Sequence, residues 1–221
     1  MCAQPWAALF DWDGVVVDSS AAHERSWELL AAEIGQPLPP DHFKRGFGRT
    51  NKVIIPELYG WAHEPEAIER LSRRKEALYR EIIQVEGLRE IPGSRAFLEG
   101  LRAAGVPCVV RSSTPRTNLD VALEVLGLRP YFRDLVSADD VTRGKPDPEV
   151  FLKAAAKAGV APEHGVVFED ATFGIQAAKA AGMWAVALTT TNPEAVLRAA
   201  GADRVVDRLD QLDPTCASWR S

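Results

Sequence analysis

The sequence predicts an α/β fold in which a parallel sheet forms the core and an all-helical subdomain is inserted near the N-terminal end. Two observations support this prediction. Short apolar runs rich in Val and Leu alternate with helix-length amphipathic segments, which is the rhythm of parallel strands joined by crossover helices. By contrast, residues 19–89 contain helical patterns and no convincing strand.

The predicted strands are apolar along their whole length and do not alternate with polar residues, as expected for strands buried on both faces. The four strongest are Ala7–Phe10, Val106–Val110, Gly165–Phe168 and Trp184–Leu188. Two shorter candidates are Leu135–Ser137 and Arg204–Asp207. A sheet of such strands needs helices on both of its faces.

The predicted core helices lie between these strands, at Ser94–Ala104, Asn118–Leu126, Pro148–Ala158, Phe173–Ala181 and Pro193–Ala200. Each is followed by a glycine suited to a left-handed residue after the last turn, namely Gly105, Gly127, Gly159, Gly182 and Gly201. Ser94 follows the turn residues Pro92 and Gly93, and we expect its side chain to cap the first helix.

The inserted subdomain is predicted to contain three helices, at Ala21–Ile34, Asn51–Leu58 and Pro65–Val85. We therefore expect residues 1–18 and 90–221 to form the core and residues 19–89 to form the helical subdomain.

Composition excludes several classes of protein. The 221 residues include 31 acidic and 26 basic side chains, giving a net charge of -5, and 46% of residues are hydrophobic. This balance argues against a nucleic-acid partner and against disorder. No apolar run approaches the length of a membrane span, so no membrane partner is expected. We expect a monomer or a weak homo-oligomer.

The cysteines favour a reducing compartment. Cys2, Cys108 and Cys216 are few, odd in number and widely spaced, which disfavours a disulfide framework or a zinc site. The N-terminal residues lack the basic region of a signal peptide. We therefore expect a cytoplasmic protein.

Polar residues follow several predicted strands, where an open parallel sheet binds its ligands. They comprise four carboxylates, a hydroxyl and an ammonium: Asp11, Asp13, Glu169, Asp170, Ser112 and Lys145. Taken singly, such acids are most often loop residues or helix caps. Together they repel one another, and a hard divalent cation such as Mg²⁺ would allow them to coexist.

The motifs that carry these residues are FDWDGVVVD at 10–18, VVRSS at 109–113, GKPDP at 144–148 and FEDATFGIQAAKAAGM at 168–183. In order and spacing they resemble the haloacid dehalogenase superfamily, in the branch of phosphatases and phosphomutases related to β-phosphoglucomutase. The resemblance covers nearly the whole chain. It implies a Rossmann-like core with an α-helical cap inserted after the first motif.

The resemblance implies a role for each carboxylate. Asp11 would be the nucleophile that attacks phosphorus, and Asp13 would be the general acid and base. Asp11, the backbone carbonyl of Asp13, Glu169 and Asp170 would hold Mg²⁺, with Glu169 binding directly or through a water molecule.

Ser112 would hydrogen-bond the phosphoryl oxygens, and Lys145 would pair with both the nucleophile and the phosphoryl group. Ser113 and Thr114 are candidates for substrate binding. For Thr114, a role in the turn or the helix cap is an equal alternative.

The sequence departs from relatives at two positions. Ala171 replaces a common Ser and so lacks its hydroxyl, and Trp12 replaces the commoner Leu between the two aspartates. We expect Trp12 to be a packing residue rather than a substrate contact.

The helical subdomain offers three further substrate-binding candidates. His23 resembles the hinge histidine of β-phosphoglucomutase, and Arg49 and Lys75 fall near positions where that mutase binds its second phosphate. The alternative for Lys75 is a solvated face, because it belongs to the charged run Arg73–Lys75.

The sequence therefore predicts a Mg²⁺-dependent phosphatase that hydrolyses a small phosphorylated metabolite, with a sugar phosphate favoured, through an aspartyl-phosphate. The alternative is a sugar phosphomutase of the β-phosphoglucomutase type. A dehalogenase is disfavoured because it needs no Mg²⁺ cluster. A Schiff-base phosphonate hydrolase has no specific signal, and a non-enzymatic module would not fill every motif position.

Overall fold

A computed structural model describes residues 6–46 and 49–215. The chain divides into two compact units, one formed by residues 1–18 and 89–221 and the other by residues 19–88. We call these the core unit and the helical unit, and each is described by itself. No helix among the described residues is long and apolar enough to cross a membrane.

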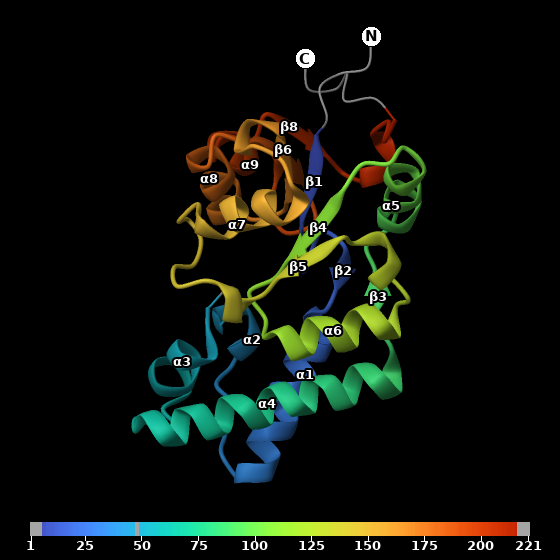
Figure 1. The fold of residues 1–221 in the computed structure, drawn as a ribbon. Helices are drawn as coiled ribbons and strands as arrows, with labels where there is room; N and C mark the ends of the chain where they lie inside the picture. Colours follow the sequence, from blue (N-terminus) through green and yellow to red (C-terminus); the bar gives the residue numbers. More distant parts are fainter. Residues whose placement is uncertain (1–5, 47–48, 216–221) are drawn as a thin grey trace. The chain divides into compact units, whose positions relative to one another are not determined.

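The core unit is built on a parallel sheet with the strand order β5-β4-β1-β6-β7-β8 (Figure 1). Its strands are β1 (Ala7–Asp11), β4 (Cys108–Arg111), β5 (Asp134–Val136), β6 (Gly165–Glu169), β7 (Trp184–Leu188) and β8 (Arg204–Val206). The chain builds outward from β1 through β4 and β5, then crosses to β6 on the other side of β1. The order of connection therefore reverses at β1, which is where such sheets bind ligands.

Helices cover both faces of this sheet, as the fully apolar strands require. They are α5 (Ser94–Ala103), α6 (Arg116–Val125), α7 (Glu149–Ala158), α8 (Thr172–Ala180) and α9 (Glu194–Ala199). Shorter turns are η2 (Arg129–Tyr131), η3 (Ala138–Asp140), η4 (Pro162–His164) and η5 (Leu209–Gln211). In Figure 1, α7, α8 and α9 lie to the left of the sheet and α5 lies to its right.

Each face of the sheet has its own apolar core. On one face, Leu9 and Val167 pack with Phe151 of α7 and Ile175 of α8. The other face carries an aromatic cluster in which Phe10 stacks on Phe168 at 4.7 Å and meets the edge of Phe97 from α5 at 6.3 Å between ring centroids. Fully buried side chains of this size each contribute about 1.5–3 kcal/mol to stability, so β1 is held firmly between its neighbours.

The expected helix ends are confirmed at the five glycines, whose φ angles lie between 64° and 103°. The prediction that Ser94 caps α5 is wrong. Gly93 holds the cap position with a φ of 90°, while the Ser94 hydroxyl donates to the carbonyl of Val16 at 3.2 Å. A longer-range hydrogen bond therefore replaces the local one.

The strand limits also differ from expectation. Asp11, Arg111 and Glu169 are the last residues of β1, β4 and β6 and do not lie beyond them. Asp11 and Arg111 are paired in the ladder between β1 and β4. A strand ends where its backbone hydrogen bonds end, so polar side chains can belong to its last residue. Two further strands, β2 (Val17–Asp18) and β3 (Arg89–Glu90), form a short antiparallel pair. Each strand is too short to give a periodic signal in the sequence. Because β3 begins at Arg89, the segment without strands ends at residue 88 and not at 89.

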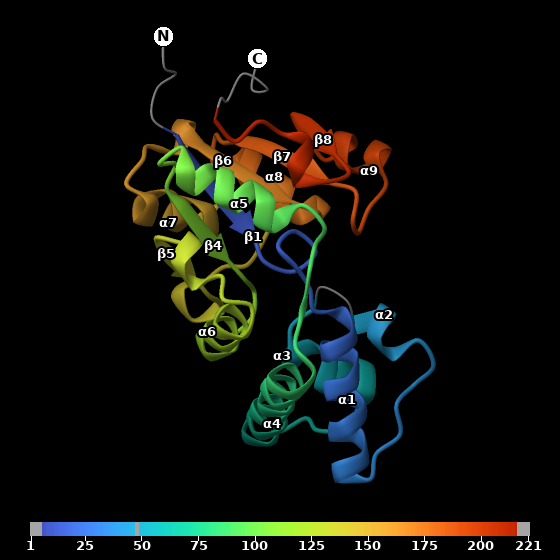
Figure 2. The same cartoon turned by 90° about the vertical axis from the view of Figure 1, so that its right-hand side faces the viewer.

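The helical unit contains α1 (Ser20–Ile34), α2 (His42–Gly46), α3 (Asn51–Val53), η1 (Ile54–Tyr59) and α4 (Pro65–Glu86). The single helix expected at 51–58 is a short α-helix that continues as the π-helical turn η1. Helices α1 and α4 lie against each other, as both views show (Figures 1 and 2). They enclose Trp27, Leu30 and Leu78 in a core of their own. Helix α2 was not expected from the sequence.

Candidate active site

The carboxylate of Asp11 is held by two cations, one on each oxygen. Lys145 Nζ donates to Oδ2 at 2.7 Å, and Arg111 Nη1 donates to Oδ1 at 3.2 Å. Asp11 is 7% exposed and Arg111 is 2% exposed. Burial raises the pKa of Asp11, but Arg111 and Lys145 together outweigh burial and hold the pKa below its usual range. Asp11 is therefore an ionised carboxylate fixed at the end of β1.

Asp13 and Ser112 lie beside Asp11 and contact each other. The Ser112 hydroxyl donates to Asp13 Oδ2 at 3.3 Å and accepts the backbone N–H of Thr114 at 3.1 Å. The Ser112 N–H donates to the carbonyl of Val136 at 2.9 Å, which extends the pairing beyond β4. Asp13 is half-buried, so unlike Asp11 it keeps access to water.

Glu169 is fully buried at the end of β6. Its Oε2 accepts the backbone N–H groups of Asp170 and Ala171, both at 2.8 Å, and its Oε1 accepts a short hydrogen bond from Lys145. A carboxylate at this place also faces the positive end of α8. Gly174 makes room for it, because a Cβ at position 174 would lie less than 3.0 Å from Glu169 Oε1.

The loop after β7 holds Asp170 in place. Thr191 Oγ1 donates a short hydrogen bond to Asp170 Oδ2, and Asn192 Nδ2 donates to the Asp170 carbonyl at 3.0 Å. Burial, followed by repulsion from Asp11, raises the pKa of Asp170 to about 6. Gly14, with a φ of 77°, lies against the same carboxylate and leaves no room there for a side chain.

The donor set fits a hard divalent metal. Asp11, Glu169 and Asp170 each offer an oxygen, and these oxygens all lie within 4.8 Å of one another. All three residues are buried, and burial, followed by repulsion from Asp11, raises the pKa of Asp170, as expected where carboxylates crowd together. Buried carboxylate oxygens at this spacing are the ligands that Mg²⁺ prefers. The Asp13 carboxylate is not part of the group, and its expected contribution is the backbone carbonyl.

The loop that carries Lys145 is fixed by Glu149. The Glu149 carboxylate accepts the backbone N–H of Thr142 at 3.2 Å and of Arg143 at 2.9 Å, and Lys153 Nζ donates to it at 2.6 Å. The hydrogen bond from Lys153, followed by those from Thr142, lowers the pKa of Glu149 to about 2. This residue was not singled out from the sequence, although it opens α7 directly after the GKPDP motif.

A Glu149→Gln variant should therefore show a pH-dependent loss of stability. Because its folded pKa is depressed, Glu149 stabilises the fold above its unfolded pKa near 4.5, and that contribution disappears as the pH falls toward 2. The difference in melting temperature between wild type and variant should be constant above about pH 5 and shrink below it. Calorimetry across pH measures this difference, with a variant of the exposed residue Glu124, Glu124→Gln, as the control. A difference in melting temperature that stays the same below pH 5 would contradict the prediction.

The structure places the remaining core candidates on specific partners. Ser113 is exposed, and its Oγ accepts from Arg111 Nη2 at 3.1 Å. Thr114 Oγ1 accepts from Asn118 Nδ2 at 3.0 Å, which corresponds to the turn alternative. Trp12 is 1% exposed, as expected for a packing residue. Cys108 is buried, while Cys2 and Cys216 lie outside the described residues.

Arg111 is a further site residue that sequence reasoning missed. It ends the run Val109-Val110-Arg111, and a charged residue at the end of an otherwise apolar strand was the available signal. Its side chain contacts Asp11 directly, so the nucleophile candidate has two cationic partners where one was expected.

In the helical unit, the half-buried His23 contacts the buried Lys75. Lys75 Nζ lies 2.8 Å from His23 Nδ1, and the His23 ring stacks on Tyr79 with 4.1 Å between centroids. Burial, followed by the charge of Lys75, holds the pKa of His23 well below its usual range, so a neutral ring accepts the hydrogen bond. Lys75 is 3% exposed, which rules out the solvated-face alternative.

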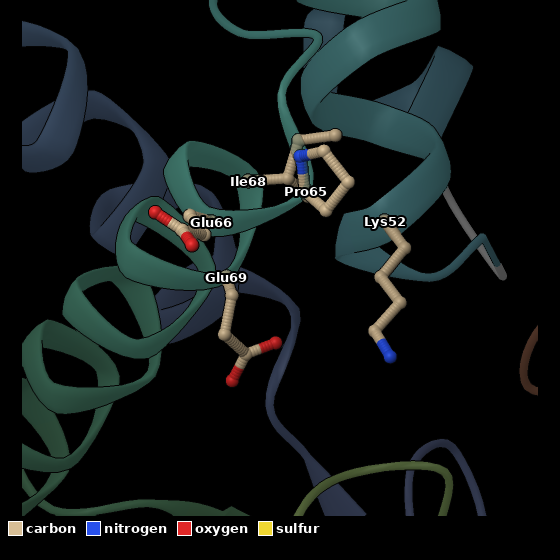
Figure 3. A pocket seen from close by; sticks show the side chains of 5 residues that line it. All are labelled: Lys52, Pro65, Glu66, Ile68 and Glu69. Carbon is tan, nitrogen blue, oxygen red and sulfur yellow. The ribbon is translucent and has the colours of Figure 1, made fainter.

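Arg49, the third candidate of the helical unit, is exposed. A depression of about 470 Å³ on this unit is lined by Lys52, Pro65, Glu66, Ile68 and Glu69 (Figure 3). In Figure 3 the Lys52 and Glu69 side chains lie on opposite sides of the opening. None of His23, Arg49 and Lys75 lines it, so it is separate from the predicted substrate residues.

A family model and a similar solved structure both point to one family of hydrolases. The family model described as haloacid dehalogenase-like hydrolase matches residues 7–182. Among solved structures, a HAD hydrolase of family IA, variant 3, from Entamoeba histolytica superposes with a TM-score of 0.84 at 27% identity, over 95% of this chain and 97% of the other.

Three curated relatives align over most of this chain. A 5-amino-6-(5-phospho-D-ribitylamino)uracil phosphatase of Arabidopsis thaliana is 35% identical over 93% of this chain, which spans 55% of that protein's length. A phosphorylated carbohydrates phosphatase of Thermotoga maritima is 32% identical over 80% of this chain and 82% of its own length. A β-phosphoglucomutase of Mycobacterium bovis is 31% identical over 93% of this chain and 90% of its own length.

Proposed function

Because the chain belongs to the haloacid dehalogenase-like hydrolase family, we propose that it is a phosphatase that hydrolyses a small phosphate monoester of the sugar-phosphate class. The observation that carries the proposal is an ionised, buried Asp11 held between two cations, with Asp13 beside it. Two relatives named as phosphatases for a phosphoribityl compound and for phosphorylated carbohydrates support the substrate class. A cytoplasmic location is part of the proposal.

In the first half of the proposed reaction, an Asp11 oxygen attacks phosphorus and the bond from phosphorus to the leaving oxygen breaks. Asp13, in its protonated form, gives its proton to that oxygen, so the leaving group departs as an alcohol. Asp11 becomes an aspartyl-phosphate. Lys145 and Ser112 position the phosphoryl group, because a carboxylate is a weak nucleophile that depends on in-line placement.

In the second half, Asp13 removes a proton from water, which attacks phosphorus and releases phosphate from Asp11. Asp11, the Asp13 carbonyl, Glu169 and Asp170 would hold a divalent metal, and Mg²⁺ fits this oxygen-only set. When bound, the metal supplies charge neutralisation for the loose transition state of phosphoryl transfer. We propose His23, Arg49 and Lys75 as residues of the cap that contribute to substrate selection.

The test is a panel of phosphorylated metabolites and p-nitrophenyl phosphate, assayed for phosphate release with and without Mg²⁺. Mg²⁺-dependent release from at least one sugar phosphate is expected. No release from any compound with any of Mg²⁺, Mn²⁺ or Co²⁺ would overturn the phosphatase proposal.

A phosphomutase is the second candidate, favoured by the 31% identity to a β-phosphoglucomutase. A mutase moves the phosphoryl group to another sugar hydroxyl, so Asp13 would activate that hydroxyl in place of water. Rapid conversion of β-glucose 1-phosphate to glucose 6-phosphate with negligible phosphate release would establish this candidate over the first.

Removal of the metal should affect activity and stability together. We expect EDTA to lower phosphate release by at least about 10²-fold and added Mg²⁺ to restore it. Mg²⁺ at a hundred times its dissociation constant should add about 2.7 kcal/mol of stability, which raises the melting temperature by roughly 5–11 °C. Differential scanning calorimetry measures the shift. A melting temperature unchanged by Mg²⁺, alongside EDTA-resistant activity, would contradict the metal assignment.

A further inference from the structure

We propose that Arg111 is a positioning residue for the nucleophile, which holds the Asp11 carboxylate by Oδ1 and supplies the second fixed positive charge of the active site. This inference deepens the proposed function and rests on it for the role of Asp11. Arg111 is buried and charged, and the proposed reaction steps assign it no other role.

Arg111 occupies a position in the sheet that ordinarily holds an apolar residue. It is the last residue of β4, where the two residues before it, Val109 and Val110, are apolar and fully buried. Burying a guanidinium is costly unless anions compensate it, so an apolar residue is the ordinary choice at such a place. The side chain is 2% exposed, and its carbon atom Cζ lies 5.8 Å from the Phe151 ring centre. A purely structural role would not require this charge.

The hydrogen bonds of the Arg111 side chain point toward the active site. Arg111 Nη1 donates to Asp11 Oδ1 at 3.2 Å, while Nη2 donates to Ser113 Oγ at 3.1 Å. Among the described residues, Nε has no hydrogen-bond partner, so the side chain is not anchored by a full set of structural contacts. Lys145 binds the other Asp11 oxygen. The two cations together therefore fix the plane of the carboxylate.

Arg111 also offsets part of the negative charge of the active site. Asp11, Asp13, Glu169 and Asp170 carry a formal charge of -4 when all are ionised, and Lys145 alone would leave -3. Arg111 reduces this to -2, which one divalent metal ion balances. The charges of Asp11, Asp13 and Asp170 all act on the guanidinium and oppose the effect of burial on its pKa. Arg111 therefore contacts Asp11 directly and also interacts with the charges of Asp13 and Asp170.

Two variants of Arg111 distinguish the effect of its positive charge from the effect of its size and hydrogen bonding. Arg111→Gln removes the charge and keeps a hydrogen-bond donor, whereas Arg111→Lys keeps the charge. We expect the Gln variant to lose about 10²-fold in kcat with a KM within about threefold of wild type, because positioning the nucleophile affects the transition state. The Lys variant should recover a substantial part of kcat.

Binding of Mg²⁺ gives a readout independent of turnover. Removing one positive charge beside the carboxylates should tighten Mg²⁺ binding by roughly three- to tenfold in Arg111→Gln, measured by isothermal calorimetry without substrate. Arg111→Lys should bind Mg²⁺ like the wild type. A residue with only a packing role would weaken Mg²⁺ binding or leave it unchanged when replaced, so the sign of the change is decisive.

Chemical rescue completes the test. In Arg111→Ala, added guanidinium ion should restore part of kcat, because the cavity retains Asp11 Oδ1 as its anion. Wild-type kcat in the Gln variant, or weaker Mg²⁺ binding together with no guanidinium rescue in a folded Ala variant, would overturn the inference. If the wild type releases no phosphate, the proposed function fails, and the calorimetric comparison of the Gln and Lys variants still decides the charge role of Arg111.

Discussion

Asp11→Asn should leave a folded protein whose phosphate release is lower by at least about 10⁴-fold, equivalent to roughly 5–6 kcal/mol of activation free energy. The amide cannot form the covalent bond to phosphorus that the proposed mechanism requires. The fold should persist, since Lys145 keeps its hydrogen bond to Glu169 and Arg111 keeps its hydrogen bond to Ser113. Steady-state assays and far-ultraviolet circular dichroism of the same preparation measure the two expectations.

Asp13→Asn is the matched control for this variant. It keeps the nucleophile and removes the proposed acid and base, so it should also turn over slowly but still accept a phosphoryl group. Intact-mass measurement after mixing with a phosphoryl donor should reveal one added phosphoryl group on Asp13→Asn and none on Asp11→Asn. A phosphorylated Asp11→Asn protein, or one with more than a tenth of wild-type activity, would rule out Asp11 as the nucleophile.

Gly174→Ala should destabilise the core unit by roughly 2–4 kcal/mol and abolish most of the activity. An added Cβ would lie less than 3.0 Å from Glu169 Oε1, and Glu169 is fully buried with hydrogen bonds to Lys145 and to two backbone N–H groups. The carboxylate must move and lose some of these bonds. This cost exceeds the gain of up to about 1 kcal/mol that alanine brings to a helix over glycine.

A double-mutant cycle with Glu169→Ala isolates the cause. Once the carboxylate is absent, Gly174→Ala has no clash to relieve and should be neutral or stabilising by up to about 1 kcal/mol, according to helix propensity. Urea unfolding of the four proteins gives the coupling energy. If Gly174→Ala costs the same with and without the Glu169 carboxylate, the close approach is not what makes glycine necessary at this position.

Much of the core could be predicted because its signals are local. The five glycines after the core helices and the uniformly apolar strands depend only on nearby residues, and the structure agrees with them. The short pair β2 and β3 could not be predicted, since two-residue strands have no periodicity. Ser94 had a local signal that proved misleading. Its hydroxyl donates to the carbonyl of Val16, far away in the sequence, instead of capping its own helix.

At the site, local sequence patterns were enough to predict the carboxylates, the hydroxyl and the lysine that gather at one edge of the sheet, because parallel strands bring their carboxyl ends together. The partner of each side chain depends on how distant parts of the chain fold together. The pairing of β1 with β4 brings Arg111 to Asp11, the bend of the chain before α8 brings Gly174 against Glu169, and the β7 loop brings Thr191 to Asp170. The Asp11–Arg111 and Asp170–Thr191 contacts depend on which strands are neighbours in the sheet, and the Gly174–Glu169 approach depends on the backbone path into α8. Neither strand order nor that path can be deduced from a local sequence pattern.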